Sequence, residues 1–218
     1  MSADHYFTAD PQAPARPTEV VFDAAGHTFR LAAAAGVFSA TRLDPGTAVL
    51  LRKAELPGPD LTGSLLDLGC GYGPITAVLA KCAPRATIYA VDVNQRALEL
   101  TRANTVGNRV VAALPDDVPA EVEFQQLWSN PPIRIGKDEL HELLSRWLPR
   151  LAADGEAWLV VAKHLGADSL AEWLRSRAYQ VIKHASQQGF RVLRITRASP
   201  TGSGGKSRDE TASDQPDW

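Results

Sequence analysis

The sequence LLDLGCGYGPI, residues 65–75, decides the fold of this chain. A short apolar segment runs into a cluster of glycines, Gly69, Gly71 and Gly73, and a proline follows at once. Glycine clusters end strands, and proline is accepted in the first turn of a helix. The stretch therefore predicts a strand, a tight loop and a helix, with the loop at the carboxyl edge of a sheet, where open α/β folds bind ligands.

Strand and helix signals alternate along the chain from residue 64. Apolar runs rich in β-branched and aromatic residues predict strands, and apolar residues three and four apart predict helices. The expected strands are residues 64–68, 87–92, 109–114, 123–128 and 156–162, and the expected helices are residues 74–83, 94–107, 138–151 and 169–177, the last capped by Asp168. This alternation indicates an α/β fold, in which helices cover both faces of a parallel sheet.

Two hairpins flank the alternating segments. Residues 18–22 and 27–32 surround a DAAG turn and lead into a helix that starts near Gly46, while residues 179–185 and 190–196 surround Gly189 and add an antiparallel C-terminal hairpin at the sheet edge. The expected division is an N-terminal hairpin and lead-in helix in residues 18–62 and the main domain in residues 63–198. Residues 1–17 and 199–218 are polar and poor in apolar residues, and they are expected to be disordered.

The composition argues against several classes of protein. No run of about 18 apolar residues suggests a membrane span, and no basic start precedes an apolar stretch at the N-terminus, so a cytoplasmic protein is expected. Cys70 and Cys82 have no second cysteine or histidine at zinc-ligand spacing, so neither a metal site nor a disulfide is expected. The net charge of −2 is unlike that of a nucleic-acid-binding protein, although residues 131–198, with 11 Lys and Arg against 7 Asp and Glu, could present a phosphate-facing surface.

The residues around the glycine loop indicate which ligand it takes. The spacing of its glycines differs from the dinucleotide fingerprint, and the loop lacks the lysine of a phosphate-binding loop. Asp67 would repel a pyrophosphate but suits a cationic ligand such as S-adenosyl-L-methionine, and Asp92, about 20 residues after the loop, suits the hydroxyls of a ribose. Each acid has a structural alternative: Asp67 could cap loop amides, and Asp92 could cap a helix.

Through residues 67–73 and Asp92 the chain resembles the class I methyltransferases, whose sheet is seven-stranded and whose cofactor is S-adenosyl-L-methionine. The resemblance implies that the loop residues Gly69, Cys70, Gly71 and Tyr72 back the methionine, with Asp67 near its amino group. It implies that Asp92 holds the ribose and that Val93 and Asn94 border the adenine. Asp116 or Asp117 would contact the adenine amine; Asp117 is our candidate, and the choice stays open.

The sequence SNPPIRIGK, residues 129–137, follows the fourth expected strand. NPP in this place resembles the methyltransferases that modify an exocyclic base amine or a glutamine amide. By that resemblance the Asn130 side-chain oxygen and the Pro131 carbonyl each accept one N–H of the amine, and Pro132 stiffens the turn. The nitrogen lone pair is then aimed at the methyl group. The alternative is a stiff turn without catalytic function.

A wider resemblance covers nearly the whole expected domain. GVFS at 36–39, LDPGT at 43–47 and the two motifs above are similar to the methyltransferase small-domain family, which includes ribosomal RNA guanine-N2 methyltransferases. It implies that Phe38, Gly46 and Thr47 close over the cofactor. It also implies ribosomal RNA or a ribosomal subunit as partner, with Arg134, Lys137 and Lys163 near phosphates.

Ile133 stands where many relatives have a phenylalanine or tyrosine that stacks on the base. Stacking contributes roughly 1–3 kcal/mol per base, so isoleucine weakens the assignment of the substrate. A small molecule, an adenine or a protein glutamine is an alternative substrate, and a cofactor- or RNA-binding protein without turnover is a second alternative. The oligomeric state and the target nucleotide are not predicted.

Overall fold

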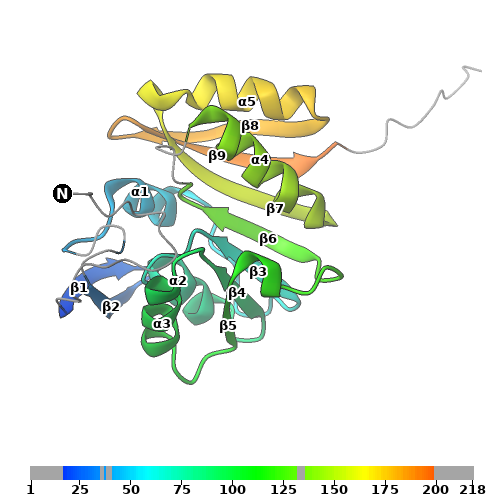
Figure 1. Cartoon of the computed structure of the whole chain (residues 1–218). Helices are drawn as coiled ribbons and strands as arrows, with labels where there is room; N and C mark the ends of the chain where they lie inside the picture. The colour runs from blue at the N-terminus through cyan, green and yellow to red at the C-terminus, as the bar shows by residue number, and fades with distance from the viewer. Residues whose placement is uncertain (1–16, 35–36, 38–40, 132–135, 199–218) are drawn as a thin grey trace, which may run out of the picture.

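The computed structural model describes residues 17–34, 37, 41–131 and 136–198. A sheet of seven strands forms its centre, in the order β5-β4-β3-β6-β7-β9-β8 (Figure 1). The strands are β3 (Ser64–Leu68), β4 (Thr87–Val91), β5 (Val110–Ala113), β6 (Phe124–Ser129), β7 (Leu151–Ala162), β8 (Tyr179–Gln187) and β9 (Phe190–Arg197). β3 to β7 pair in parallel, and β9 is antiparallel to both β7 and β8. The expected class, a parallel sheet with a C-terminal antiparallel hairpin at its edge, is confirmed.

Helices cover both faces of the sheet because the chain changes direction at β3. From β3 it moves outward through β4 to β5, and then it returns to β6 on the other side of β3. Right-handed crossovers therefore place the connecting helices of the two halves on opposite faces. The helices of the fold are α1 (Pro45–Lys53), α2 (Pro74–Cys82), α3 (Gln95–Asn104), α4 (Lys137–Trp147) and α5 (Ala167–Ser176), with short 3₁₀ turns η1 (Pro115–Asp117), η3 (Leu148–Arg150) and η4 (Lys163–Leu165).

Alternate side chains of the strands feed two separate cores. Leu65, Ile88 and Trp128 point to the face covered by α1 and α2, whereas Leu66, Leu127 and Leu159 point to the face covered by α4 and α5. All six of these side chains are fully buried. Burial on both faces explains why the strands read as continuous apolar runs, not as an alternating pattern.

The N-terminal hairpin, β1 (Pro17–Ala24) and β2 (His27–Ala34), forms a separate two-stranded sheet beside α3 (Figure 1). Val20 and Leu31 bury one face of the hairpin in the core shared with α1 and α2. The hairpin that the DAAG turn predicted is therefore present, and it packs into the core of the domain. The terminal segments that are expected to be disordered lie outside the described residues, apart from Pro17, which begins β1.

Two sequence predictions about local structure are wrong. Asp168 does not cap α5: the residue before the helix is Gly166, and Asp168 lies in the first turn, where it pairs with Lys183 and Arg191. Leu151 begins β7 and does not end α4. The strand starts early because Gly155 allows an irregularity in its pairing with β6: a side chain there would meet the Phe124 carbonyl at 2.7 Å.

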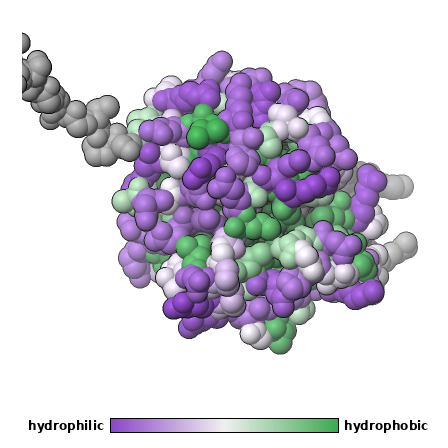
Figure 2. All heavy atoms as spheres, turned by 180° about the vertical axis from the view of Figure 1, so that it is seen from behind, coloured by the Kyte–Doolittle hydropathy of each residue, from purple (hydrophilic) through white to green (hydrophobic). Residues whose placement is uncertain are grey.

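The surface is mostly hydrophilic. Figure 2 shows hydrophobic side chains gathered in a band across the middle of one face, inside a hydrophilic surround. None of the described helices is both long enough and apolar enough to span a membrane.

Candidate functional site

The glycine loop and the NPP turn meet because their strands are neighbours. β3 ends at Leu68 and β6 ends at Ser129, and the Ser129 hydroxyl donates a hydrogen bond to the Leu68 carbonyl at 2.7 Å. The strand order reverses between these two strands, and open α/β sheets bind ligands at such a switch point. A hollow there is lined by residues of both loops and of α1: Asp44, Thr47, residues 69–72, Pro74, Ile75 and Asn130.

The glycine loop turns back sharply over the end of the sheet. The backbone N–H groups of Gly69 and Cys70 both donate to the Val91 carbonyl, at 2.8 and 3.0 Å. Gly71 and Gly73 have φ values of 58° and 90°, a region that side chains disfavour. At Gly73 a side chain would also meet the Thr101 hydroxyl oxygen at 2.9 Å. Glycine is therefore required here both by the backbone conformation and by close packing on α3.

Asp92 fixes the glycine loop to the end of β4. Its Oδ2 accepts a hydrogen bond from the Gly71 N–H at 2.9 Å, and its Oδ1 accepts one from the Asn94 N–H at 2.9 Å. The side chain is almost completely buried, and this burial raises its pKa. Because each carboxylate oxygen has more than one lone pair, these two bonds leave acceptor capacity for a ligand hydroxyl.

Asp67 lies beneath the loop and has one oxygen without a partner. Its Oδ2 accepts from both the backbone N–H and the hydroxyl of Thr76, at 2.9 and 2.6 Å, and so caps the start of α2. No donor reaches Oδ1, which is buried, among the residues that the structure describes. Burial raises the pKa of this carboxyl to about 7, although the bonds from Thr76 lower it. Oδ2 is therefore occupied by a capping contact to α2, and the expected contact of Asp67 with a cationic ligand stays a prediction.

The raised pKa of Asp67 predicts a dependence of stability on pH. The native pKa of about 7 exceeds the ordinary value of 3.8, so between these values the folded protein binds a proton that the unfolded chain releases. The contribution is complete below about pH 4 and is lost as the pH rises through 7, at up to about 1.4 kcal/mol per pH unit. Urea unfolding at several pH values should show this slope for the wild type and not for Asp67→Asn; parallel curves for the two proteins would contradict it.

Two side chains of α3, which the sequence analysis did not name, donate hydrogen bonds to backbone carbonyls of the glycine loop. The Thr101 hydroxyl donates to the Gly71 carbonyl at 3.0 Å, and Asn104 Nδ2 donates to the Tyr72 carbonyl at 2.8 Å. Asn104 also pairs with Ala32 of β2: it accepts from the Ala32 N–H and donates to its carbonyl, both at 2.8 Å. The Asn104 side chain therefore links the N-terminal hairpin to the glycine loop.

Asn104→Ala is expected to weaken cofactor binding by about tenfold. The change leaves the Tyr72 carbonyl and both backbone groups of Ala32 without this partner, and a net loss of about 1 kcal/mol per hydrogen bond is typical. Isothermal titration with S-adenosyl-L-methionine measures the effect. Asn108→Ala is the matched control, since its Nδ2 bonds only locally, to Thr105. Equal cofactor affinities for the two variants would show that cofactor binding does not depend on the hydrogen bonds of Asn104.

Asn130 lies at the end of β6 with its amide nitrogen turned toward α1. Its Nδ2 donates to Asp44 Oδ1 at 2.7 Å and to Thr47 Oγ1 at 3.0 Å. The same Asp44 oxygen accepts from the Thr47 N–H at 2.9 Å and so caps α1. The amide oxygen of Asn130 has no donor among the described parts of the chain. Asp44 is a site residue that the sequence analysis did not name as one.

Gly46 allows α1 to approach this cluster closely. A side chain at Gly46 would meet Asp44 Oδ1 and Phe190 Cε1 at 3.0 Å and Asn130 Nδ2 at 3.3 Å. Phe190 is the first residue of β9, so the C-terminal hairpin also packs against the start of α1. Gly46 was expected to close over the cofactor; in the structure it makes room for the contact between Asp44 and Asn130.

The remaining cofactor candidates lie beyond Asp92. Val93 is 44% exposed, an unusual place for an apolar side chain, and it stays a candidate for contact with an adenine. Asn94 is buried and caps α3 by accepting from the N–H groups of Arg96 and Ala97. Asp116 pairs with Arg146 at 2.8 Å, whereas Asp117 is exposed in η1 and stays our candidate for the contact with the adenine amine.

The expected RNA-contacting residues are only partly described. Lys137 begins α4 and Lys163 begins η4 directly after β7, and both are exposed. Pro131 is buried directly after Asn130. Phe38, Pro132, Ile133 and Arg134 lie outside the described residues, so their expected roles stay predictions.

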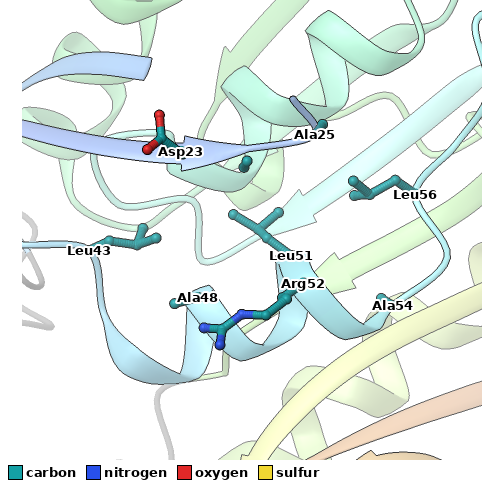
Figure 3. A pocket seen from close by; sticks show the side chains of 9 residues that line it. Asp23, Ala25, Leu43, Ala48, Leu51, Arg52, Ala54 and Leu56 are labelled. Atoms are coloured by element: carbon teal, nitrogen blue, oxygen red, sulfur yellow. The ribbon is translucent and has the colours of Figure 1, made fainter. Parts of the chain in front are cut away.

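A larger cavity, of about 480 Å³, lies elsewhere between β1 and α1 (Figure 3). Leu51 projects from α1 between Leu43 and Leu56, and Asp23 and Arg52 lie at the rim. This lining includes none of the predicted site residues, so cavity size does not identify the site. Within the described residues no group of His, Cys, Asp or Glu side chains could hold a metal ion, and Cys70 and Cys82 are both free.

Comparison with known proteins gives consistent results. The model of the methyltransferase small domain matches residues 28–194. The Bacillus subtilis protein YbxB, whose function is uncharacterized, is 31% identical over 198 residues, which are 88% of this chain and 98% of that protein. Ribosomal RNA small subunit methyltransferase C of Acinetobacter baumannii strain AYE is 33% identical over 77% of this chain.

The chain spans about half the length of the ribosomal RNA methyltransferases it matches: 51% of the Acinetobacter protein, and 42% of the one from Shewanella loihica, to which it is 36% identical. A solved structure of Thermus thermophilus RsmC, a 16S rRNA methyltransferase in complex with AdoMet and guanosine, aligns with a TM-score of 0.71 at 23% identity, over 86% of this chain and 52% of that one. At that identity the likeness establishes the fold. Together with the match to the family model, it confirms the resemblance seen in the sequence: the chain belongs to the methyltransferase small-domain family, whose members have a class I fold.

Proposed function

We propose that this protein is an S-adenosyl-L-methionine-dependent N-methyltransferase that acts on an exocyclic base amine, guanine N2 in ribosomal RNA. The observation that carries the proposal is the orientation of Asn130. Its amide nitrogen is held by Asp44 and Thr47, which leaves the amide oxygen to accept a hydrogen bond from a substrate N–H.

The residues beside Asn130 fit S-adenosyl-L-methionine. Asp67 Oδ1 and the Tyr72 hydroxyl are buried polar atoms without partners among the described residues, and a bound ligand could supply those partners. A carboxylate suits the positively charged amino group of the methionine moiety, and Asp92 suits the ribose hydroxyls. S-adenosyl-L-methionine supplies a methyl group made electrophilic by the positive charge on its sulfur.

The chain's own residues would act on the acceptor amine. An exocyclic amine shares its lone pair with the ring, so it becomes a nucleophile only when it is pyramidalised. Asn130 Oδ1 and the Pro131 carbonyl would each accept one N–H, which orients the lone pair toward the cofactor side of the site. The same two oxygens stabilise the positive charge that develops on nitrogen, without reorganisation during the reaction. The transfer itself then needs no general base, and a proton can leave afterwards.

The relatives support ribosomal RNA as the substrate. Curated relatives are named ribosomal RNA small subunit methyltransferase C, and the Thermus protein is described with guanosine. The matched region corresponds to about half of those proteins, so RNA contacts made by their other half are not carried over. Lys137 and Lys163 are exposed, and their charged side chains could bind phosphate groups of the RNA backbone.

Transfer of a labelled methyl group tests the proposal. The purified protein is incubated with methyl-labelled S-adenosyl-L-methionine and with either naked ribosomal RNA or ribosomal subunits from a strain that lacks the gene, and the RNA is digested to nucleosides. Label in N2-methylguanosine supports both the reaction and the acceptor. Label in N6-methyladenosine, or in a protein glutamine, would correct the substrate. Cofactor binding without any transfer to these acceptors would contradict the proposal.

A further inference from the structure

We propose that Asp44 is a positioning residue for methyl transfer, because it fixes which end of the Asn130 amide faces the substrate. The inference rests on the proposed function, in which the Asn130 oxygen accepts an N–H of the amine. It adds a residue 86 positions away in the sequence, on the lead-in to α1, that acts through Asn130 and need not touch the substrate.

The chemistry of Asp44 determines the orientation of the amide. A carboxylate only accepts hydrogen bonds, so the Asn130 atom that lies 2.7 Å from Asp44 Oδ1 must be the NH₂ group. Were the amide rotated by 180°, two oxygens would face each other at this distance. Thr47 Oγ1, at 3.0 Å from Nδ2, does not settle the choice alone, because a hydroxyl can accept or donate. Asp44 therefore selects a single orientation.

This selection decides which substrates the site accepts. With Nδ2 bound to Asp44, the group that Asn130 presents is an acceptor, which suits an amine or amide N–H. In the rotated state Asn130 would present its NH₂ group to the substrate NH₂ group, and neither could accept. A substrate is rejected strongly when its binding leaves buried polar groups unpaired. Asp44 is thus a determinant of specificity for nitrogen acceptors that carry hydrogens.

Asp44 is itself held in place. Oδ1 accepts from the Thr47 N–H, and the absence of a side chain at Gly46 lets the carboxylate and the amide meet. At the other end of α1, the His184 ring lies 2.9 Å from the Lys53 carbonyl, a contact that joins the helix to β8. Helix α1 is therefore held at both ends, so the Asp44 carboxylate has a defined position from which to orient the Asn130 amide.

Two substitutions of Asp44 separate its roles. Asp44→Ser keeps an N-cap of comparable strength for α1, but its shorter side chain falls short of Asn130. Asp44→Asn keeps an oxygen that can accept from both Thr47 and Asn130. Asp44→Ser should lower kcat about tenfold or more, with melting temperature and cofactor affinity close to wild type, because small losses of position are costly in rate. Asp44→Asn should recover most of that loss.

Thr47→Val supplies an independent check, since it removes the second acceptor of Asn130 Nδ2 and leaves the Thr47 backbone N–H in place. It should lower kcat in the same direction by a smaller factor. Asp60→Ser is the matched control, because Asp60 is an exposed acid that pairs with Arg85 away from the site.

A double-mutant cycle with Asn130→Ala distinguishes the inference from the proposed function. If Asp44 acts through Asn130, Asp44→Ser has no further effect on kcat in the Asn130→Ala background. An equal loss in both backgrounds, or no loss from Asp44→Ser in the wild-type background, would overturn the role of Asp44 while leaving that of Asn130. Full activity of Asn130→Ala itself would instead overturn the proposed function.

Discussion

Asn130→Ala is expected to lower kcat for methyl transfer by about 10²–10³, while the dissociation constant of S-adenosyl-L-methionine changes by less than threefold. The rate falls because the substituted side chain has no oxygen to orient the amine and to stabilise the charge that develops on it; one preorganised hydrogen-bonding group contributes a factor of this size. Cofactor affinity is retained because the glycine loop is held by Asp92, Thr101 and Asn104. Single-turnover kinetics and calorimetry measure the two quantities separately.

Asn130→Asp provides a sharper comparison for this prediction. It keeps an acceptor oxygen for the amine but places a second carboxylate oxygen where Nδ2 lies, 2.7 Å from Asp44. Repulsion between the two acids should leave the variant nearly as slow as Asn130→Ala, and adding Asp44→Asn should restore part of the rate. A rate for Asn130→Ala within threefold of wild type would refute a catalytic role for this side chain.

Asp92→Ala is expected to weaken cofactor binding by about 10² or more. The carboxylate is buried, and it accepts hydrogen bonds from the Gly71 and Asn94 N–H groups. Hydrogen bonds to charged groups contribute about 1.5–3 kcal/mol each, and the substitution also removes the proposed acceptor for the ribose hydroxyls. Calorimetric titration of the cofactor checks the affinity, with Asp60→Ala as an exposed acidic control.

Adenosine, which lacks the methionine part of the cofactor but keeps the ribose, identifies the cause of that loss. If Asp92 holds the ribose, Asp92→Ala should weaken binding of adenosine as well as of the complete cofactor. If Asp92 only shapes the glycine loop, adenosine binding should change much less. Unchanged affinity for the complete cofactor would remove Asp92 from the site altogether.

The sequence predicted the parts of the site that follow directly from strand ends. The glycine loop, Asp67, Asp92 and Asn130 all come within a few residues of a strand, and neighbouring parallel strands bring their carboxyl ends to the same edge. The structural alternatives were also informative. Asp67 caps α2 with one oxygen, and its other oxygen has no partner among the described residues, so the capping contact does not use the whole carboxylate.

The residues that the sequence did not reveal act across long separations. Asn104 and Ala32 are 72 positions apart, and Asp44 and Asn130 are 86 positions apart. Nothing local distinguishes Asn104 from any polar residue at a helix end, and Asp44 reads simply as a helix cap. Their roles depend on where β2 and α1 pack against the sheet, which periodicity and capping signals do not specify.

The excess of basic residues in 131–198 predicted a phosphate-facing surface, but several of these side chains are bound to other groups of the fold. Arg191 and Lys183 pair with Asp168, and Arg194 pairs with Glu156. Arg175 and Arg197 donate to backbone carbonyls. These cations serve the packing of the C-terminal hairpin, so an excess of charge in the sequence does not translate directly into a surface that faces phosphates.

The hydrogen bonds of Asn104 indicate how much of the chain a functional domain needs. A chain shortened to begin at Leu43 would keep the complete seven-stranded sheet, Asp44, Thr47 and the glycine loop, yet it would lack Ala32, to which Asn104 is paired. Asn104 would then be free to turn away from the Tyr72 carbonyl. The N-terminal hairpin thus stabilises the glycine loop through Asn104. We therefore expect that a minimal functional domain of this protein includes the hairpin.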